Sequence, residues 1–81
     1  MVLIKLLFFG RLSDFSKGVP DTISAATPRE ILELLQQDFP ILAAELRDPH
    51  VLIAVNKTIG DWDSELTNGC EVAFLPPVTG G

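Results

Sequence analysis

The chain has 81 residues, and its 6 Lys and Arg residues against 11 Asp and Glu residues give a net charge of −5 at pH 7. A chain of this length holds one hydrophobic core, so a deep pocket with a full set of catalytic groups is not expected, and function should lie at the surface or at an end. The scattered basic residues argue against nucleic acid or a membrane surface as partner, and no apolar run reaches the roughly 20 residues that span a bilayer.

The first predicted element is a strand over Val2 to Phe9, in which Lys5 sets the outward phase. The inward positions are Val2, Ile4, Leu6 and Phe8, and the outward positions beside Lys5 are Leu3, Leu7 and Phe9. Three apolar residues on an outer face are unexpected. A loop through Gly10 to Pro20, with a helical turn around Leu12 to Phe15, leads to a second strand near Asp21 to Ala25.

A helix is predicted to begin after Thr27, which can cap it, because Pro28 suits the first turn and Glu30 can reach back to the cap amide. Its buried stripe is predicted to be Ile31, Leu34, Leu35 and Phe39, with Arg29, Glu33, Gln36 and Gln37 in solvent. Pro40 stops this helix, and Ile41 to Leu46 form a second short helix.

Three further strands are predicted in the second half of the chain. Val51 to Val55 is rich in β-branched residues, and Asn56 and Lys57 make a tight turn into a short strand at Thr58 to Ile59. The run Thr67 to Gly69 is a turn signal that leads into the last strand, Glu71 to Leu75.

An apolar patch follows if the first and last strands are neighbours. With Glu71 pointing outward, Ala73 and Leu75 lie on the outer face of the last strand. The patch then consists of Leu3, Leu7, Phe9, Ala73 and Leu75. Because an exposed apolar patch commonly marks a contact site, we predict that Leu7, Phe9, Ala73 and Leu75 contact a partner.

The end of the chain is the most informative stretch. Pro76 and Pro77 lack a backbone donor and fix φ, so they should end the sheet and direct the chain away in extended form. We therefore predict a folded domain over 1–75 and an extended tail over 76–81. The tail residues are Pro76, Pro77, Val78, Thr79, Gly80 and Gly81. Six extended residues reach on the order of 20 Å, and the two glycines have no side chains to obstruct entry into a channel.

The carboxylate of Gly81 is the candidate reactive group. A terminal carboxyl has a pKa of about 3.5 and is ionised at pH 7, so it reacts only after activation, most simply as an acyl adenylate made from ATP. The activated group could then accept an amine or a sulfide. The alternative is that two terminal glycines form a frayed end without a role.

Three segments carry a resemblance to a known family. These are GCEVAFLPPVTGG at 69–81, AVNKT at 54–58 and KLLFFGRL at 5–12. Together they resemble the small subunits of molybdopterin synthase, which are ubiquitin-like β-grasp sulfur carriers, and the resemblance covers essentially the whole chain. Asn68 and Cys70 stand where acidic residues look more usual. The implied fold is α+β, with a mixed sheet of four to five strands packed on one main helix and a flexible Gly-Gly tail.

The resemblance also implies a chemistry and a set of partners. A ubiquitin-activating-enzyme-like adenylyltransferase would consume ATP to form the Gly81 adenylate, and a sulfur donor protein would convert it to 1-thioglycine. The large catalytic subunit of the synthase would receive the tail, in a heterotetramer of two small and two large subunits. Sulfur would pass to cyclic pyranopterin monophosphate to build the dithiolene of molybdopterin. The chain itself would be no enzyme and would bind no cofactor.

Three alternatives remain open at this point. The thiocarboxylate could supply thiamine precursors or tRNA instead. The chain could be a ubiquitin-like modifier joined through Gly81 to lysines, or an interaction module whose tail has no role.

Other chemistry-bearing residues are assigned to structure. Cys70 is predicted as a small filler, since a reactive Cys needs a cationic neighbourhood and Glu71 lies beside it. His50 has no carboxylate or Cys partner apparent in the sequence and is predicted as a surface loop residue. Trp62 and Phe15 are predicted to cover the edge of the core.

No metal site is predicted. Asp61, Asp63 and Glu65 alternate like metal ligands, but the glycine and later Glu of a calcium loop are missing, so a solvated loop is expected. The single Cys forms no pair or Cys/His pattern, and it fits a reducing cytoplasm. Arg11 and Lys57, near turns, are candidates to meet acidic groups of a partner.

Overall fold

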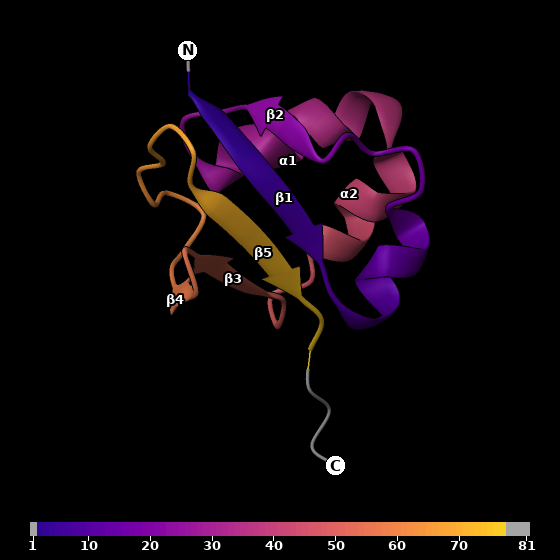
Figure 1. Cartoon of the computed structure of the whole chain (residues 1–81). Helices are drawn as coiled ribbons and strands as arrows, with labels where there is room; N and C mark the ends of the chain where they lie inside the picture. Colours follow the sequence, from indigo (N-terminus) through magenta and orange to yellow (C-terminus); the bar gives the residue numbers. More distant parts are fainter. Residues whose placement is uncertain (1, 78–81) are drawn as a thin grey trace.

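The computed structural model of the chain describes residues 2–77, which form a five-stranded sheet with helices on one face (Figure 1). The elements in chain order are β1 (Leu3–Phe8), the 3-10 helix η1 (Gly10–Phe15), β2 (Thr22–Ser24), α1 (Pro28–Asp38), α2 (Pro40–Leu46), β3 (Leu52–Val55), β4 (Thr58–Ile59) and β5 (Glu71–Leu75). Each element lies within a residue or two of its predicted position. The predicted element order is confirmed.

The strands are ordered β2-β1-β5-β3-β4, so the first and last strands lie side by side as predicted. β1 and β5 run parallel, with Lys5 opposite Glu71 and Phe8 opposite Phe74. The other neighbouring strands are antiparallel. A mixed sheet with its N- and C-terminal strands paired in parallel and α1 crossing one face is the β-grasp architecture, which confirms the expected α+β fold class.

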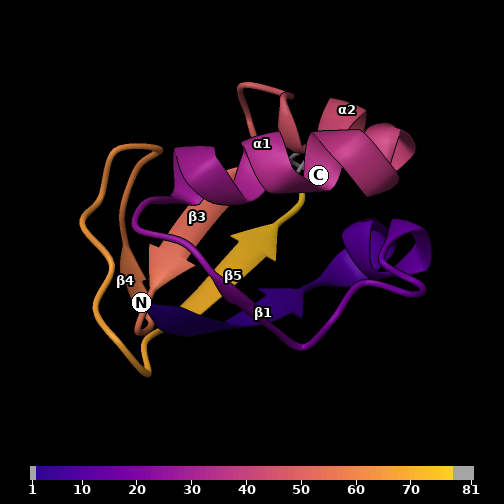
Figure 2. The ribbon, with the colours of Figure 1, turned by 90° about the horizontal axis from the view of Figure 1, so that it is seen from above.

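Both α-helices cover the same face of the sheet, and no helix of residues 2–77 lies on the opposite face (Figure 2). Phe74 lies at the centre of the core and is fully buried. Its ring stacks on Phe8 with centroids 5.5 Å apart and lies 6.0 Å from the ring of Trp62. The buried residues around it come from every layer: Ile4, Leu6, Leu12, Ile31, Leu35, Leu42, Leu46, Ile53 and Val72. Trp62 therefore closes one edge of the core, as predicted, while Phe15 remains 39% exposed.

The start of α1 follows the predicted cap. Thr27 is extended, and its Oγ1 accepts a hydrogen bond of 3.2 Å from the backbone N–H of Glu30, while Pro28 occupies the first turn. The return bond from the Glu30 carboxylate to the cap amide is not among the hydrogen bonds within residues 2–77. Capping by Thr27 alone satisfies one of the free amides of the first turn.

The buried stripe of α1 differs from the prediction at Leu34. Ile31 and Leu35 are buried, but Leu34 is 42% exposed, and Leu32 packs against the core instead. Because successive residues are about 100° apart around a helix, a stripe centred between Ile31 and Leu32 leaves Leu34 at its edge. The same rotation leaves Gln36 half-buried, with a buried Oε1 that has no partner within residues 2–77, although solvent exposure was predicted.

Two turns fix the register of the sheet. Asn56 and Lys57 both have positive φ, 49° and 68°, as a two-residue hairpin turn of the twist-compatible kind requires. Asn56 also ties this turn to β5, because its N–H donates to the Glu71 carbonyl (2.8 Å) and its Oδ1 accepts from the Glu71 N–H (2.9 Å). At the other end, Asn68 Oδ1 accepts from the N–H of Leu3 (2.9 Å), which fastens the loop before β5 to β1.

Candidate functional site

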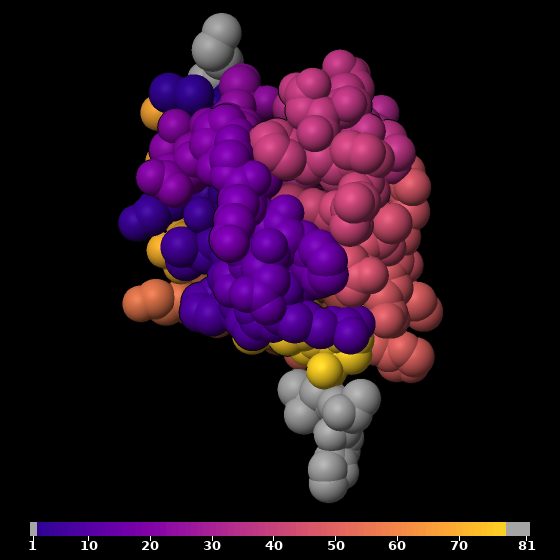
Figure 3. Space-filling view, turned by 90° about the vertical axis from the view of Figure 1, so that its right-hand side faces the viewer, coloured from indigo at the N-terminus to yellow at the C-terminus, as the bar shows by residue number. Residues whose placement is uncertain are grey.

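The chain leaves the sheet at Pro76, directly after β5 ends at Leu75. Pro76 and Pro77 are half-buried, so the first two residues of the predicted tail pack against the domain. Figure 3 shows the yellow end of the described chain at the foot of the molecule, beneath purple atoms; β5 contacts η1 there. The predicted tail residues Val78, Thr79 and Gly80 and the predicted reactive residue Gly81 lie outside the described residues.

A groove of about 450 Å³ lies on the sheet face that no helix covers. Its lining residues are Leu7, Phe9, Ala54, Lys57, Ile59, Glu71, Ala73 and Leu75. The structure thus brings together the four residues predicted to contact a partner. Leu3, the remaining member of the predicted patch, is 50% exposed on the same face but does not line the groove.

The hollow shape of the groove follows from residue size. Ala54 of β3 pairs with Ala73 of β5, and both are small and nearly buried. Ile59 of β4 pairs with Ala54 on the other side and is 65% exposed. Phe9, at 47% exposure, stands beyond the end of β1. Small side chains between large exposed ones leave a depression that apolar side chains of a partner could fill.

Sequence reasoning missed Ala54 and Ile59 as lining residues. The alternation along β3 places Leu52 and Ala54 on the outer face, opposite Leu75 and Ala73. That alternation was readable from the sequence. The pairing of β3 with β5, and so the position of its outer face beside the patch, was not.

The groove has a charged end and an apolar end. Glu71 begins β5 and lies near the turn residue Lys57, whereas Leu75 ends β5 at the point where the chain leaves the sheet. Lys57 and Glu71 are the charged lining residues. The apolar end of the groove therefore adjoins the start of the tail, so a protein docked in the groove lies beside the departing chain.

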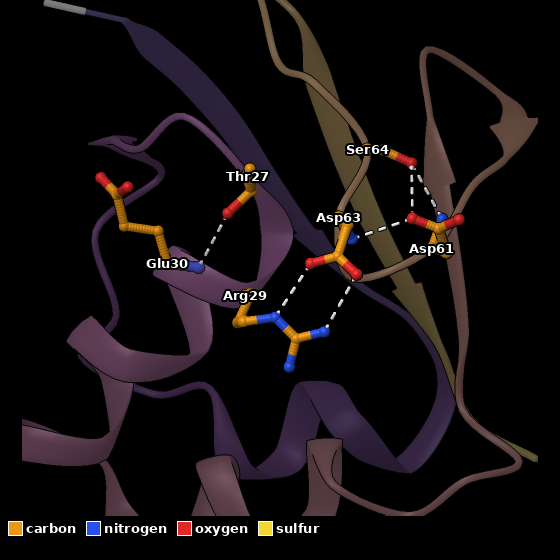
Figure 4. Close-up of polar contacts among 6 residues, drawn as sticks. All are labelled: Thr27, Arg29, Glu30, Asp61, Asp63 and Ser64. Carbon is orange, nitrogen blue, oxygen red and sulfur yellow. Dashed lines mark hydrogen bonds and ion pairs between the residues drawn. The ribbon is translucent and has the colours of Figure 1, made fainter.

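The loop between β4 and β5 is fastened to α1 by an ion pair (Figure 4). Arg29 Nε and Nη2 donate to Asp63 Oδ1 and Oδ2 at 3.0 and 3.2 Å. This contact lowers the pKa of Asp63 and raises that of Arg29, chiefly through the side-chain hydrogen bond. Asp61 accepts from the Asp63 N–H (2.8 Å), and its own N–H donates to Ser64 Oγ (2.9 Å). These carboxylates order the loop.

Several other predicted residues are now placed. Cys70 is buried, in agreement with its prediction as a filler. His50 is exposed in a loop as predicted but does have a carboxylate partner, because Asp48 Oδ1 lies 3.2 Å from Nδ1 and accepts from the His50 N–H at 2.8 Å. The backbone hydrogen bond lowers the pKa of Asp48. Arg11, a candidate for an acidic partner group, instead lies 3.4 Å from Glu45 of α2.

Two negative observations concern residues 2–77. No group of three His, Cys, Asp or Glu side chains in this part of the chain is arranged to hold a metal ion. None of its helices combines the length and the apolar character needed to cross a membrane.

Comparison with known proteins identifies relatives along nearly the whole chain. The ThiS family model matches residues 6–81. The molybdopterin synthase sulfur carrier subunit of Escherichia coli (strain K12) is 39% identical over 83 residues, which cover 98% of this chain and 100% of that protein. Similarity on this scale includes the groove-lining strands and extends through the tail.

Two solved structures share the fold. One is a complex of subunits 1 and 2 of the molybdopterin-converting factor from Helicobacter pylori 26695, with a TM-score of 0.69, 26% identity, and coverage of 99% of this chain and 100% of that one. The other is small archaeal modifier protein 1 of Methanosarcina acetivorans, with a TM-score of 0.83, 21% identity, and coverage of 100% and 98%. At that identity the second likeness concerns the fold alone.

Proposed function

The chain belongs to the ThiS family, and we propose that it is the sulfur carrier subunit of a molybdopterin synthase. The observation that carries the proposal is the groove whose apolar end adjoins the chain exit at Pro76. A carrier needs a rigid surface that partners can grip and a reactive end that reaches beyond it. The described domain offers the first, and the sequence after Pro77 offers the second.

The reactive group in this proposal is the carboxylate of Gly81. An ATP-dependent adenylyltransferase transfers AMP to it and releases pyrophosphate, because an ionised carboxylate is a poor electrophile at pH 7. A hydrosulfide equivalent from a sulfur donor protein then attacks the acyl carbon. The acyl–sulfur bond forms, AMP leaves, and the product is the Gly81 thiocarboxylate.

In the transfer step, the thiocarboxylate sulfur attacks a carbon of cyclic pyranopterin monophosphate, and a C–O bond at that carbon breaks; the oxygen leaves as water or, where the cyclic phosphate opens, with the phosphate. Water then cleaves the acyl–sulfur bond, so the sulfur stays on the pterin and Gly81 returns to a carboxylate. A dithiolene has two sulfur atoms, so two charged carriers are consumed for each molybdopterin. Delivery within a closed site shields the labile thiocarboxylate and raises its local concentration.

The large subunit of the synthase is the proposed occupant of the groove. Phe9, Ile59 and Leu75 would enter its apolar surface, while Lys57 and Glu71 would set the register by charge. This is consistent with the Helicobacter pylori relative, which was solved as a complex of subunits 1 and 2. We propose a heterotetramer of two small and two large subunits, acting in the cytoplasm. The net charge of −5 favours partners with basic surfaces.

No catalytic role is assigned to the domain itself. Within residues 2–77 the groove is lined by apolar side chains and one Lys and one Glu, and the Arg29, Asp63 and Asp48 side chains serve loop structure. The partners would therefore supply the catalytic groups, and the adenylyltransferase would bind the ATP.

Intact-mass measurement tests the proposed charging directly. Chain incubated with the adenylyltransferase, ATP and a sulfide source should gain a species in which one oxygen is replaced by sulfur. A variant ending at Gly80 should give no such species. Repeated absence of the species from the full chain would exclude a sulfur carrier. Ladders of higher-mass lysine conjugates would instead indicate the protein modifier.

A further inference from the structure

Gly10 and Pro76 meet where the two central strands end. Gly10 follows β1 with φ +57°, and a Cβ atom built on it would lie 2.7 Å from Cγ of Pro76 and 3.4 Å from its Cδ. Real Cβ atoms essentially never come closer than 3.0 Å to another heavy atom. The Pro76 ring can therefore occupy this position only because Gly10 has no side chain.

Both residues are held by the structure around them. Before Gly10, the Phe9 N–H donates to the Phe74 carbonyl at 3.0 Å, which extends the β1–β5 pairing by one step. After it, the Gly10 carbonyl accepts from Ser13 Oγ at 2.8 Å inside η1. On the other side, the Pro76 ring is fused to its own backbone and fixes φ. It cannot rotate away from Gly10 as a flexible side chain would.

We propose that Gly10 is a positioning residue that, by seating the Pro76 ring, sets the direction in which the chain leaves β5. This inference rests on the proposed sulfur transfer from Gly81. Pro76 is the first residue after the strand, so a change in its position redirects the following residues. A side chain at position 10 would push Pro76 away from the domain while leaving the groove residues in place.

The competing explanation is that position 10 needs glycine only for its positive φ. Gly69 provides a matched comparison, because its φ is +86° and a Cβ built on it meets nothing within 4 Å. Gly69→Ala thus carries the backbone strain without the contact. Gly10→Ala carries both. Any difference in sulfur transfer between the two variants reports the contact with Pro76.

The experiment uses the thiocarboxylated full chain with the large synthase subunit and cyclic pyranopterin monophosphate. Gly10→Ala should lower kcat by roughly ten- to a hundredfold, with the KM of the large subunit for the thiocarboxylated chain close to the wild-type value, since misplacement by about 1 Å costs this much in rate. Pro76→Ala removes the ring from the other side without a clash and should also lower kcat. Gly69→Ala should keep the wild-type kcat.

Pro76→Ala keeps the proposal falsifiable if Gly10→Ala does not fold, because it removes the ring without backbone strain and without a new heavy atom. In the double variant Gly10→Ala/Pro76→Ala the Cγ contact is gone, so adding Gly10→Ala to Pro76→Ala should lower the melting temperature no more than Gly69→Ala lowers that of the wild-type chain. Wild-type kcat in Gly10→Ala or in Pro76→Ala would overturn the positioning role and leave the proposed function standing. An equal loss in Gly69→Ala would also overturn it. A wild-type chain that acquires the thiocarboxylate but never transfers sulfur would overturn both.

Discussion

Ala54 and Ala73 face each other across β3 and β5, and together they form the floor of the groove on the open face of the sheet. Ala73 was predicted to contact a partner, but its pairing with Ala54 was not. The two alanines form a depression because their side chains are short and buried, whereas the larger Phe9 and Ile59 at the sides of the groove are exposed. The depression is thus a property of strand pairing and side-chain size. It suits a partner that inserts apolar side chains.

Phe9→Asp should weaken docking of the large subunit. Phe9 is 47% exposed and lines the groove, so a charge there must be desolvated without a partner. The dissociation constant should rise by roughly 30- to 1000-fold, or about 2–4 kcal/mol, with little change in the free energy of unfolding. Isothermal titration calorimetry measures the first quantity and urea denaturation the second.

Leu3→Asp is the matched control for that experiment. Leu3 begins β1, the strand that ends just before Phe9; it lies on the same face and is similarly exposed, but it does not line the groove. Its docking should stay close to that of the wild-type chain. If Leu3→Asp weakens docking as much as Phe9→Asp, the groove is not the contact surface.

Ile31→Ala and Leu34→Ala test the rotation of α1. Ile31 is fully buried, whereas Leu34 is 42% exposed. Truncating Ile31 should lower the free energy of unfolding by about 2–5 kcal/mol, and truncating Leu34 by less than about 1 kcal/mol. Urea denaturation separates the two. Equal decreases in the free energy of unfolding would mean that Leu34 is as buried as Ile31, as the sequence predicted, and would contradict the orientation of α1 in the structure.

Lys57→Gly should stabilise the fold. Lys57 has φ 68° in a two-residue hairpin turn whose second position strongly favours glycine. Relief of the strain should raise the free energy of unfolding by about 0.5–1 kcal/mol after the entropy cost of the glycine. The same change removes the cation from the groove, so association with an acidic site should slow. A fall in stability would show that the Lys57 side chain contributes more than its backbone costs.

The ion pair between Arg29 and Asp63 should make a small, pH-dependent contribution to stability. The pKa of Asp63 is lowered in the folded chain, so its contribution is complete above the ordinary Asp value of 3.8 and is lost as pH falls through the lowered pKa. The pKa of Arg29 is raised above its ordinary value, chiefly by the side-chain hydrogen bond to Asp63, so the guanidinium stays charged throughout the acid and neutral range and does not contribute to the pH dependence there. Both groups are exposed, and salt should weaken the pair further.

Thermal melts between pH 7 and pH 2 check this expectation. The wild-type chain should lose its advantage over Arg29→Ala in the acid limb of the profile and hold it at neutral pH. Arg29→Lys, which cannot form the two-point contact, should fall between them. A difference from Arg29→Ala that is independent of pH in this range would assign the effect to packing of the Arg29 stem.

The sequence sufficed where one residue type has a strong local effect. Thr27 with Pro28 placed the start of α1, Lys5 set the phase of β1, and Pro76 placed the end of β5. These signals act through the backbone within a few residues. They do not depend on what packs against them.

The rest depended on contacts between segments far apart in the chain. Leu34 is as apolar as Leu35, and only the position of the sheet decides which of them is buried. Arg11 looked free for a partner until α2 brought Glu45 within 3.4 Å. Ile59 lines the groove because β4 pairs with β3. Gly10 contacts Pro76 because the end of β5 lies beside the end of β1. No local pattern reports such neighbours.

Reconstituted sulfur transfer measures whether the chain acts as the sulfur carrier of a molybdopterin synthase. The chain is charged to its thiocarboxylate, mixed with the large synthase subunit and cyclic pyranopterin monophosphate, and followed by intact mass of the chain and by molybdopterin formed. A chain extended by one residue after Gly81 serves as the control that folds but cannot be charged. Two thiocarboxylates should revert to carboxylates for each molybdopterin produced, and the extended chain should give no product. A stable thiocarboxylate with no molybdopterin, or equal product from the extended chain, would contradict this role.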